Sequence, residues 1–194
     1  SETDSNGTEL LYNANDFLTK VVQDYSSDAA SYALGVDLDL CNVNMTYNGD
    51  TVGGITFDGK NHTIFHVKRG ETIANYAAGS IYGYGDNVTV KNLTIKGKSE
   101  AGTAFVRYLL YNGRIENCVN YASISGGARI NGGTVAGAFA AAACKGPKLL
   151  YRTTGIVNCV NHGDVQTTGT YAGGILGVVV NSFQGNFTAG TLGS

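Results

Sequence analysis

Two aspartates have the type and spacing that acid–base or cation chemistry uses. Asp37 and Asp39 lie two residues apart in a segment that alternates apolar and polar residues, so both point to one face of the predicted strand. A carboxylate pair of this kind can hold a cation or act as acid and base. A solvated outer strand face explains the pair more simply, and we prefer that interpretation.

Histidines and cysteines could form a metal site, but their spacing does not favour one. His62 and His66 fall on one side of a straight strand about 13 Å apart, too far for one ion unless the chain bends. Asp58 lies close by in sequence, and His162 is interpreted as a turn residue. No pair of cysteines has the CxxC spacing typical of zinc sites. We therefore predict no catalytic residue, no metal and no cofactor.

Tyrosines with nearby arginines are the best candidates for ligand binding. The matching triplets 109–111 and 149–151 end in Tyr111 and Tyr151, and Arg114 and Arg152 follow them. Tyr84 takes the corresponding place in an earlier unit. Tyrosine rings pack on sugar faces and arginines bond hydroxyls or carboxylates, so these five residues are a candidate glycan site. A tyrosine column that merely covers an outer sheet is the simpler alternative.

A repeated step of an asparagine followed by an apolar residue organises the elements that would position these side chains. The asparagines are Asn92, Asn117, Asn158 and Asn186, separated by 25, 41 and 28 residues. Short strand-like segments lie between them, with glycine or asparagine at the breaks. Units that keep their order while the gaps vary are typical of a solenoid with loops of variable length. We predict that the asparagines form a structural ladder and that the following apolar residues form an interior column.

The predicted fold is an all-β, right-handed parallel β-helix with one helix over its N-terminal end. The helix spans residues 13–24, where apolar residues recur at helical spacing after a capping asparagine. Residues 1–12 are predicted to be a flexible segment, and 13–194 a single domain. Cys118 and Cys159 occupy the same repeat position, so we predict free, stacked thiols in the interior.

Composition excludes two function classes. The formal net charge is −2, which gives no electrostatic basis for nucleic-acid binding. No apolar run approaches 18 residues, so we predict no transmembrane segment, and no leader is visible in this sequence.

Several phrases resemble the GLUG motif of bacterial surface proteins. They are 117–120, Asn-Cys-Val-Asn, and 171–177, Tyr-Ala-Gly-Gly-Ile-Leu-Gly, and 12–18, 34–40 and 57–64 resemble the segment that precedes such motifs. The chain departs from the pattern at 138–143, where Ala-Phe-Ala-Ala-Ala-Ala replaces a glycine-rich stretch. The resemblance implies an adhesin-like parallel β-helix, secreted or of lipoprotein type, at the outer cell surface.

These observations favour a non-catalytic surface module for adhesion or glycan binding, with a polysaccharide or host surface glycan as its partner. A polysaccharide-acting lyase or hydrolase on the same scaffold is one alternative. A structural spacer, or a piece of a longer surface protein that associates end to end, is another.

Overall fold

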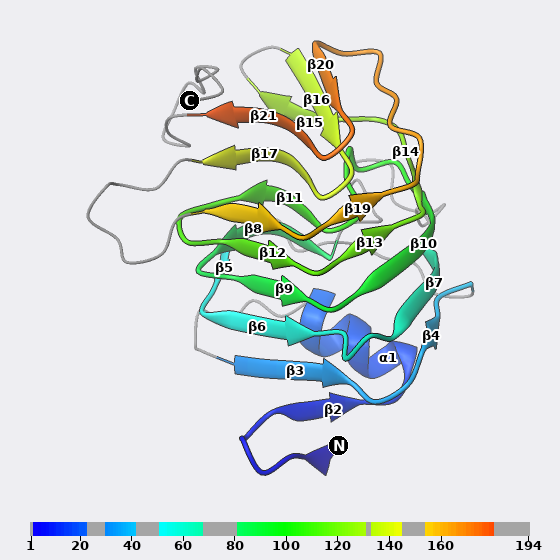
Figure 1. Ribbon diagram of the computed structural model, residues 1–194, viewed down its shortest axis with the longest axis vertical. Helices are drawn as coiled ribbons and strands as arrows, with labels where there is room; N and C mark the ends of the chain where they lie inside the picture. The colour runs from blue at the N-terminus through cyan, green and yellow to red at the C-terminus, as the bar shows by residue number, and fades with distance from the viewer. Residues whose placement is uncertain are drawn as a thin grey trace.

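The computed structural model describes residues 2–22, 30–41, 51–67, 81–130, 133–144 and 154–180, and only the backbone of residues 51–53, 67, 83, 84, 86 and 128–130 within them. Nearly all regular structure in these ranges is β, with one helical segment near the N-terminus (Figure 1). The predicted all-β class is therefore confirmed. The last predicted ladder position, Asn186, lies outside the described residues.

Four sheets account for the named strands. The first sheet has the order β1 (Glu2–Thr3), β2 (Glu9–Leu11), β3 (Ala30–Leu34), β6 (Ile55–Asp58), β9 (Thr89–Lys91), β12 (Arg114–Glu116) and β18 (Gly155–Val157). The second contains β4 (Leu38–Asp39), β7 (Thr63–Val67), β10 (Thr94–Ser99), β13 (Val119–Asn120) and β19 (Val160–Asn161), with β14 (Ser123–Ile124) also paired with β10. The third contains β5 (Thr51–Gly53), β8 (Tyr82–Asp86), β11 (Val106–Leu109), β17 (Ala140–Cys144) and β21 (Leu176–Val180). The fourth is small and contains β15 (Ala128–Ile130), β16 (Gly133–Gly137) and β20 (Tyr171–Gly173).

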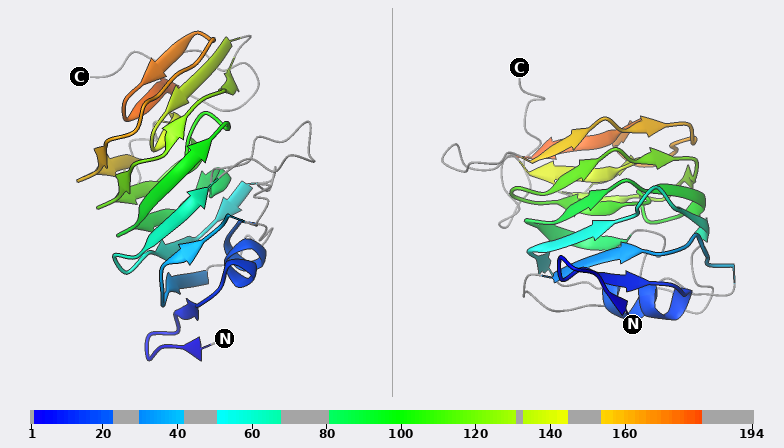
Figure 2. Two further views of the ribbon diagram at one scale, coloured as in Figure 1. Left: turned by 90° about the vertical axis from the view of Figure 1, so that its right-hand side faces the viewer. Right: turned by 60° about the horizontal axis from the view of Figure 1, so that its bottom comes forward.

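The chain visits the first three sheets in turn. From β3 to β11 it adds one strand to the first, the second and the third sheet before it returns to the first. Among the named pairings only β1–β2 and β15–β16 are antiparallel. The views in Figure 2 show the result as layers of strands stacked one on another. Because neighbouring strands are about 4.8 Å apart, residues at the same register form columns that run up the molecule.

The core lies between the sheets and is built from these columns. Phe57, Val90 and Ile115 are in register in the first sheet, and all three are fully buried. On the third-sheet side, Phe105 contacts Phe139 with ring centroids 4.9 Å apart. The residue after each ladder asparagine also points inward: Leu93 and Cys118 are buried, and Cys159 is half-buried. Alternation of inward and outward side chains thus fixes which residues of each strand reach the surface.

The N-terminal helical segment is less regular than predicted within the described residues. The sequence predicts a helix over 13–24, whereas the structure has α1 at Ala14–Phe17 followed by a wider π-helical turn, η1, at Leu18–Val22. Asn13 caps α1, since its Oδ1 accepts the Asp16 N–H at 2.8 Å. Phe17 is buried and contacts Phe57 with ring centroids 5.6 Å apart. The segment packs at the N-terminal end of the stack, as Figure 2 shows.

Residues 2–12 form strands, whereas the sequence suggests a flexible segment there. Strand β2 pairs in parallel with β3, and Leu11 is completely buried against the core. The Asp4 carboxylate shapes the preceding turn, because its Oδ1 accepts the N–H groups of Asn6 and Thr8 at 2.8 and 3.0 Å. One buried apolar residue and one turn-forming aspartate therefore position the two short strands and the turn of this stretch against β3.

The ladder asparagines form the corner between the first and second sheets. Asn92, Asn117 and Asn158 all have left-handed backbone conformations, with φ of 54°, 52° and 53°. Asparagine tolerates this conformation better than other non-glycine residues. Their side chains are half-buried or exposed, and the Asn117 Nδ2 lies 3.4 Å from the Asn92 Oδ1. A more deeply buried asparagine pair lies three residues further along the chain, where Asn120 Nδ2 donates to Asn161 Oδ1 at 2.9 Å.

Candidate functional site

Only Tyr111 and Arg114 of the predicted glycan site have described side chains. Tyr111 is half-buried and packs against a cluster of buried side chains of the third sheet. Arg114 begins β12, and its Nε donates to the Glu116 Oε1 at 2.9 Å. Only the backbone of Tyr84 is described, and Tyr151 and Arg152 lie outside the described residues. The glycan site at these five residues therefore stays a prediction.

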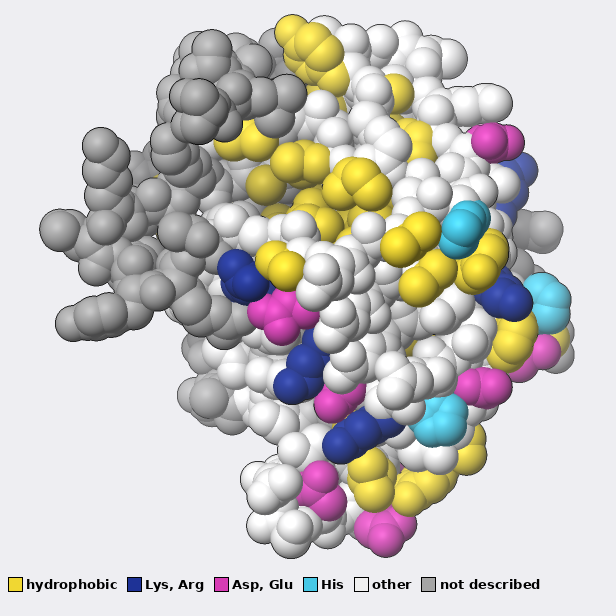
Figure 3. Space-filling view, in the orientation of Figure 1, with side chains coloured by type: hydrophobic (Ala, Val, Ile, Leu, Met, Phe, Trp, Pro, Cys, Tyr) yellow, Lys and Arg dark blue, Asp and Glu magenta, His cyan; other side chains and the backbone are white. Residues whose placement is uncertain are grey.

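A row of aromatic and basic side chains lies on the second sheet. Phe65 lies within β7 and Lys96 within β10, whereas Tyr121 and His162 directly follow β13 and β19. The four residues lie in consecutive layers, and we call them the aromatic row. The register places the four residues one above another. The residues that directly precede them pair across the sheet: Ile64 with Ile95, Ile95 with Asn120, and Asn120 with Asn161. In Figure 3 histidine, lysine and hydrophobic side chains gather over this part of the surface.

The members of the aromatic row contact each other through their faces. The Tyr121 and His162 rings are stacked, with centroids 4.8 Å apart and an interplanar angle of 15°. The Lys96 ammonium lies 5.5 Å from the Phe65 centroid and 5.1 Å from the Tyr121 centroid, within the range of cation–π attraction. Tyr121 is 48% exposed. The row is thus held in place by its own contacts, while Lys96, Tyr121 and His162 remain exposed.

Two aspartate–histidine pairs flank the N-terminal end of the aromatic row. The His62 Nδ1 lies 3.1 Å from the Asp37 Oδ1, and the His66 Nδ1 lies 2.7 Å from the Asp39 Oδ1. His66 has a left-handed φ of 57°, so the strand bends where the sequence predicts a straight one. Each histidine therefore has its own carboxylate. Among the described residues no three or more of histidine, cysteine, aspartate and glutamate lie close enough together to hold a metal ion.

Hydrogen bonds lower the pKa of both aspartates. For Asp37 the largest cause is the backbone N–H of Thr63, followed by the bond with His62. For Asp39 the largest cause is the bond with His66, followed by the backbone N–H of Cys41. Both carboxylates are thereby held ionised, which keeps negative charge beside two histidines at the edge of the row.

We expect these lowered pKa values to make stability fall in acid. A carboxyl whose pKa is lower in the folded than in the unfolded chain stabilises the fold above the ordinary aspartate value of about 3.9 and loses that contribution as pH falls through its folded pKa. Thermal unfolding followed by circular dichroism between pH 6 and pH 2 should therefore decline less steeply in the Asp37→Asn, Asp39→Asn double variant. Asp164→Asn, an exposed residue elsewhere, should keep the wild-type decline. Equal curves for wild type and double variant would contradict the assignment.

Two thiols lie beneath the aromatic row, in the interior. The structure holds Cys118 and Cys159 as free thiols in adjacent layers, Cys118 buried and Cys159 half-buried. Their mutual hydrogen bond raises the pKa of Cys118 and lowers that of Cys159 to about 7, and burial raises the pKa of Cys118 further. Each thiol also donates to a carbonyl oxygen of the preceding layer, Cys118 to Val90 and Cys159 to Ile115. They therefore fill the core and lie on the opposite face of the sheet from the row.

Comparison with known proteins identifies the architecture and not an activity. The fold and surface define a mostly β chain with stacked parallel sheets and an exposed aromatic row. No family model and no curated protein matches this sequence. A solved structure described as "a putative immunoglobulin A1 protease from Bacteroides ovatus" is similar, with 21% sequence identity and a TM-score of 0.70. The match covers 92% of this chain and 55% of that chain, so this chain spans about half the length of the protein it resembles.

In the described part of the chain no helix has the length and apolar character that crossing a membrane requires.

Proposed function

We propose that this chain is a right-handed parallel β-helix that binds glycans through the aromatic row at the outer cell surface. The exposed stack of Tyr121 on His162 is the observation that carries the proposal. Tyr121 and His162 are both exposed, and exposed aromatic side chains pack against sugar rings. The Tyr121 hydroxyl and the neighbouring Lys96 can bond sugar hydroxyls or a carboxylate. Adhesion would follow from glycan binding without any chemical step.

The β-helix part of the proposal is supported by the order in which the chain visits its sheets. Parallel neighbours in the first three sheets are joined by passages through the other two, so each circuit adds a layer. Connections between parallel strands of one sheet are right-handed in nearly all proteins. The resemblance to GLUG-motif surface proteins supports the same architecture and the extracellular location. The predicted residues Tyr111 and Arg114 have no part in this proposal.

Removing the Tyr121 ring should weaken glycan binding by about tenfold or more, because an aromatic anchor at the centre of a contact typically contributes well over 1 kcal/mol. Binding can be measured on an array of neutral and acidic oligosaccharides and then by titration calorimetry on the best ligand. Tyr121→Ala should lose affinity, and Tyr121→Phe, which keeps the ring, should retain most of it.

Tyr171→Ala is the matched control, because Tyr171 is also exposed but lies on β20 of the fourth sheet. Its affinity should equal that of the wild type. The proposal fails if the wild-type protein binds no member of the array, or if Tyr121→Ala binds as tightly as Tyr171→Ala.

A polysaccharide-acting enzyme is a second candidate, favoured by the two aspartate–histidine pairs. His62 and His66 each lie within hydrogen-bond distance of a carboxylate, which is the arrangement that a general base uses. Both pairs lie beside the aromatic row, so a bound glycan would pass near them. An assay for new reducing ends or unsaturated sugars, run on the glycans that bind, separates the enzyme from the binding module. A structural spacer would neither bind nor cleave them.

A further inference from the structure

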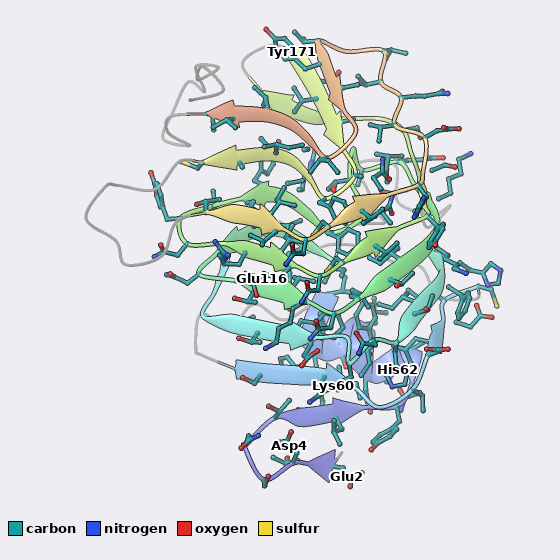
Figure 4. All side chains as sticks on the ribbon, viewed as in Figure 1. Glu2, Asp4, Lys60, His62, Glu116 and Tyr171 are labelled. Atoms are coloured by element: carbon teal, nitrogen blue, oxygen red, sulfur yellow. The ribbon has the colours of Figure 1, made fainter. Side chains whose placement is uncertain are left out.

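A small polar cavity lies on a different face from the aromatic row, at the N-terminal end of the first sheet. Residues of the turn between β1 and β2 and of β3, β6 and β9 line this partly open cavity, whose volume is about 180 Å³. Figure 4 shows Asp4 on this turn and Lys60 beyond the end of β6, on the same side of the molecule. At about 30 Å³ for each water molecule, the volume holds roughly six waters, which suits one sugar ring and not an oligosaccharide.

The two carboxylates of the cavity are already fixed by bonds within the protein. Asp4 Oδ1 accepts two backbone N–H groups of its own turn. Asp58 Oδ1 accepts the Lys60 N–H at 2.8 Å and the Asn92 Nδ2 at 3.1 Å, and its Oδ2 lies 3.9 Å from the Lys60 Nζ. Both are therefore rigid acceptors whose remaining lone pairs can take hydrogen bonds from a ligand.

Two lysines line the cavity, and Lys91 is the one whose ammonium contacts no carboxylate of the described residues. It lies between Asp58 and Glu116 in the register of the first sheet. Asp58 is engaged as described, and Glu116 accepts the Arg114 Nε, so each neighbouring carboxylate has another cation beside it. The Lys91 ammonium makes no hydrogen bond or ion pair within the part of the chain that the structure describes, since the bonds of this residue are made by its backbone. Figure 3 shows the alternating charges along this face.

Three side-chain hydroxyl groups also line the cavity. Thr8, Ser31 and Thr56 line the cavity, and their side chains bond to none of the described residues. Hydroxyls both donate and accept, so together with two carboxylates they match the hydroxyl groups of a sugar. A divalent cation is disfavoured, because two lysines share the site.

We infer that this cavity binds a single sugar residue that carries a carboxylate. The carboxylate pairs with the Lys91 ammonium, and the ring hydroxyls bond to Thr8, Ser31, Thr56 and the free oxygen of Asp4. The site is separate from the aromatic row, so it goes beyond the proposed function and does not depend on it. The cavity would select acidic sugar residues, whereas the aromatic row would bind sugar rings through its aromatic side chains.

Titration calorimetry with methyl glycosides of glucuronic and galacturonic acid tests the inference, with methyl glucoside and methyl galactoside as neutral counterparts. The wild type should bind at least one acid about tenfold more tightly than its neutral counterpart, since a hydrogen bond to a charged group typically contributes about 1.5–3 kcal/mol. Lys91→Gln should abolish that difference. Thr56→Val should weaken both sugars.

Lys98→Gln is the matched control, because Lys98 is an exposed lysine on β10 of the second sheet. This variant and Tyr121→Ala should both bind the acidic sugar as the wild type does, which separates the cavity from the aromatic row. Equal affinity for acidic and neutral sugars, or no effect of Lys91→Gln, overturns the inference. Acetate bound as tightly as the uronic acids also overturns it, since the site would then recognise a bare anion.

Discussion

Phe105→Ala is expected to lower the free energy of unfolding by about 3–5 kcal/mol, the usual range for removing a fully buried phenylalanine. Phe105 and Phe139 are both completely buried, and their rings meet with centroids 4.9 Å apart and an interplanar angle of 41°. They fill the space between the sheets near β11 and β17. Alanine would leave a void beside Phe139 that the stacked strands cannot close, because each strand is fixed by hydrogen bonds to the layers on both sides.

Urea denaturation followed by circular dichroism measures this loss. Phe105→Leu should lose much less stability, since leucine refills most of the volume. Tyr171→Ala, which removes an exposed ring, should stay within about 0.5 kcal/mol of the wild type. A loss below 1 kcal/mol for Phe105→Ala would show that the interior at this point is not packed as the structure describes.

The strand pattern could be predicted from the sequence because its cause is local. Asparagine followed by an apolar residue marks a corner that needs a left-handed backbone and then an inward side chain, and the structure has that geometry at Asn92, Asn117 and Asn158. The parallel pairing of β9 with β12 and of β12 with β18 agrees with the repeat. The helix was predicted to be regular, because apolar spacing does not distinguish a regular helix from the wider turn at Leu18–Val22.

We did not predict the aromatic row, although a regular spacing of its residues is present in the sequence. Lys96, Tyr121 and His162 are each the fourth residue after a ladder asparagine. The residue after the asparagine points inward, so counting by two along the strand places the fourth residue outward. Tyr111 was selected instead because its triplet recurs in the sequence, and recurrence does not report which face a residue occupies.

The cavity could not be predicted, because it depends on a turn that folds back over the sheet. The polar residues 1–12 predict a flexible segment, and nothing local shows that Leu11 is buried or that β2 pairs with β3. Lys91 and Thr8 are far apart in sequence and meet only through that pairing. Contacts of this kind arise from tertiary structure and leave no spacing to recognise.

Asn120→Ala is expected to lower the free energy of unfolding by about 2–4 kcal/mol, because it leaves buried backbone groups without partners. The Asn120 side chain is completely buried; its Oδ1 accepts the Ala122 N–H at 3.1 Å and its Nδ2 donates to the Ala122 carbonyl at 2.9 Å. The same Nδ2 donates to Asn161 Oδ1 in the next layer. Water cannot replace these bonds inside the sheet, so the loss exceeds that of an ordinary hydrogen bond.

Asn161 is the matched control for Asn120, because it makes the same turn bonds one layer further on. Its Nδ2 donates to the Gly163 carbonyl at 3.0 Å and its Oδ1 accepts the Gly163 N–H at 2.9 Å, but its side chain is only half-buried. Solvent can reach the groups that Asn161→Ala frees, so this variant should lose clearly less stability than Asn120→Ala in urea denaturation. Asn120→Asp should lose more at pH 7 than at pH 4, since its carboxylate must be buried when ionised. Equal losses for Asn120→Ala and Asn161→Ala would show that burial does not set the strength of the buried asparagine pair.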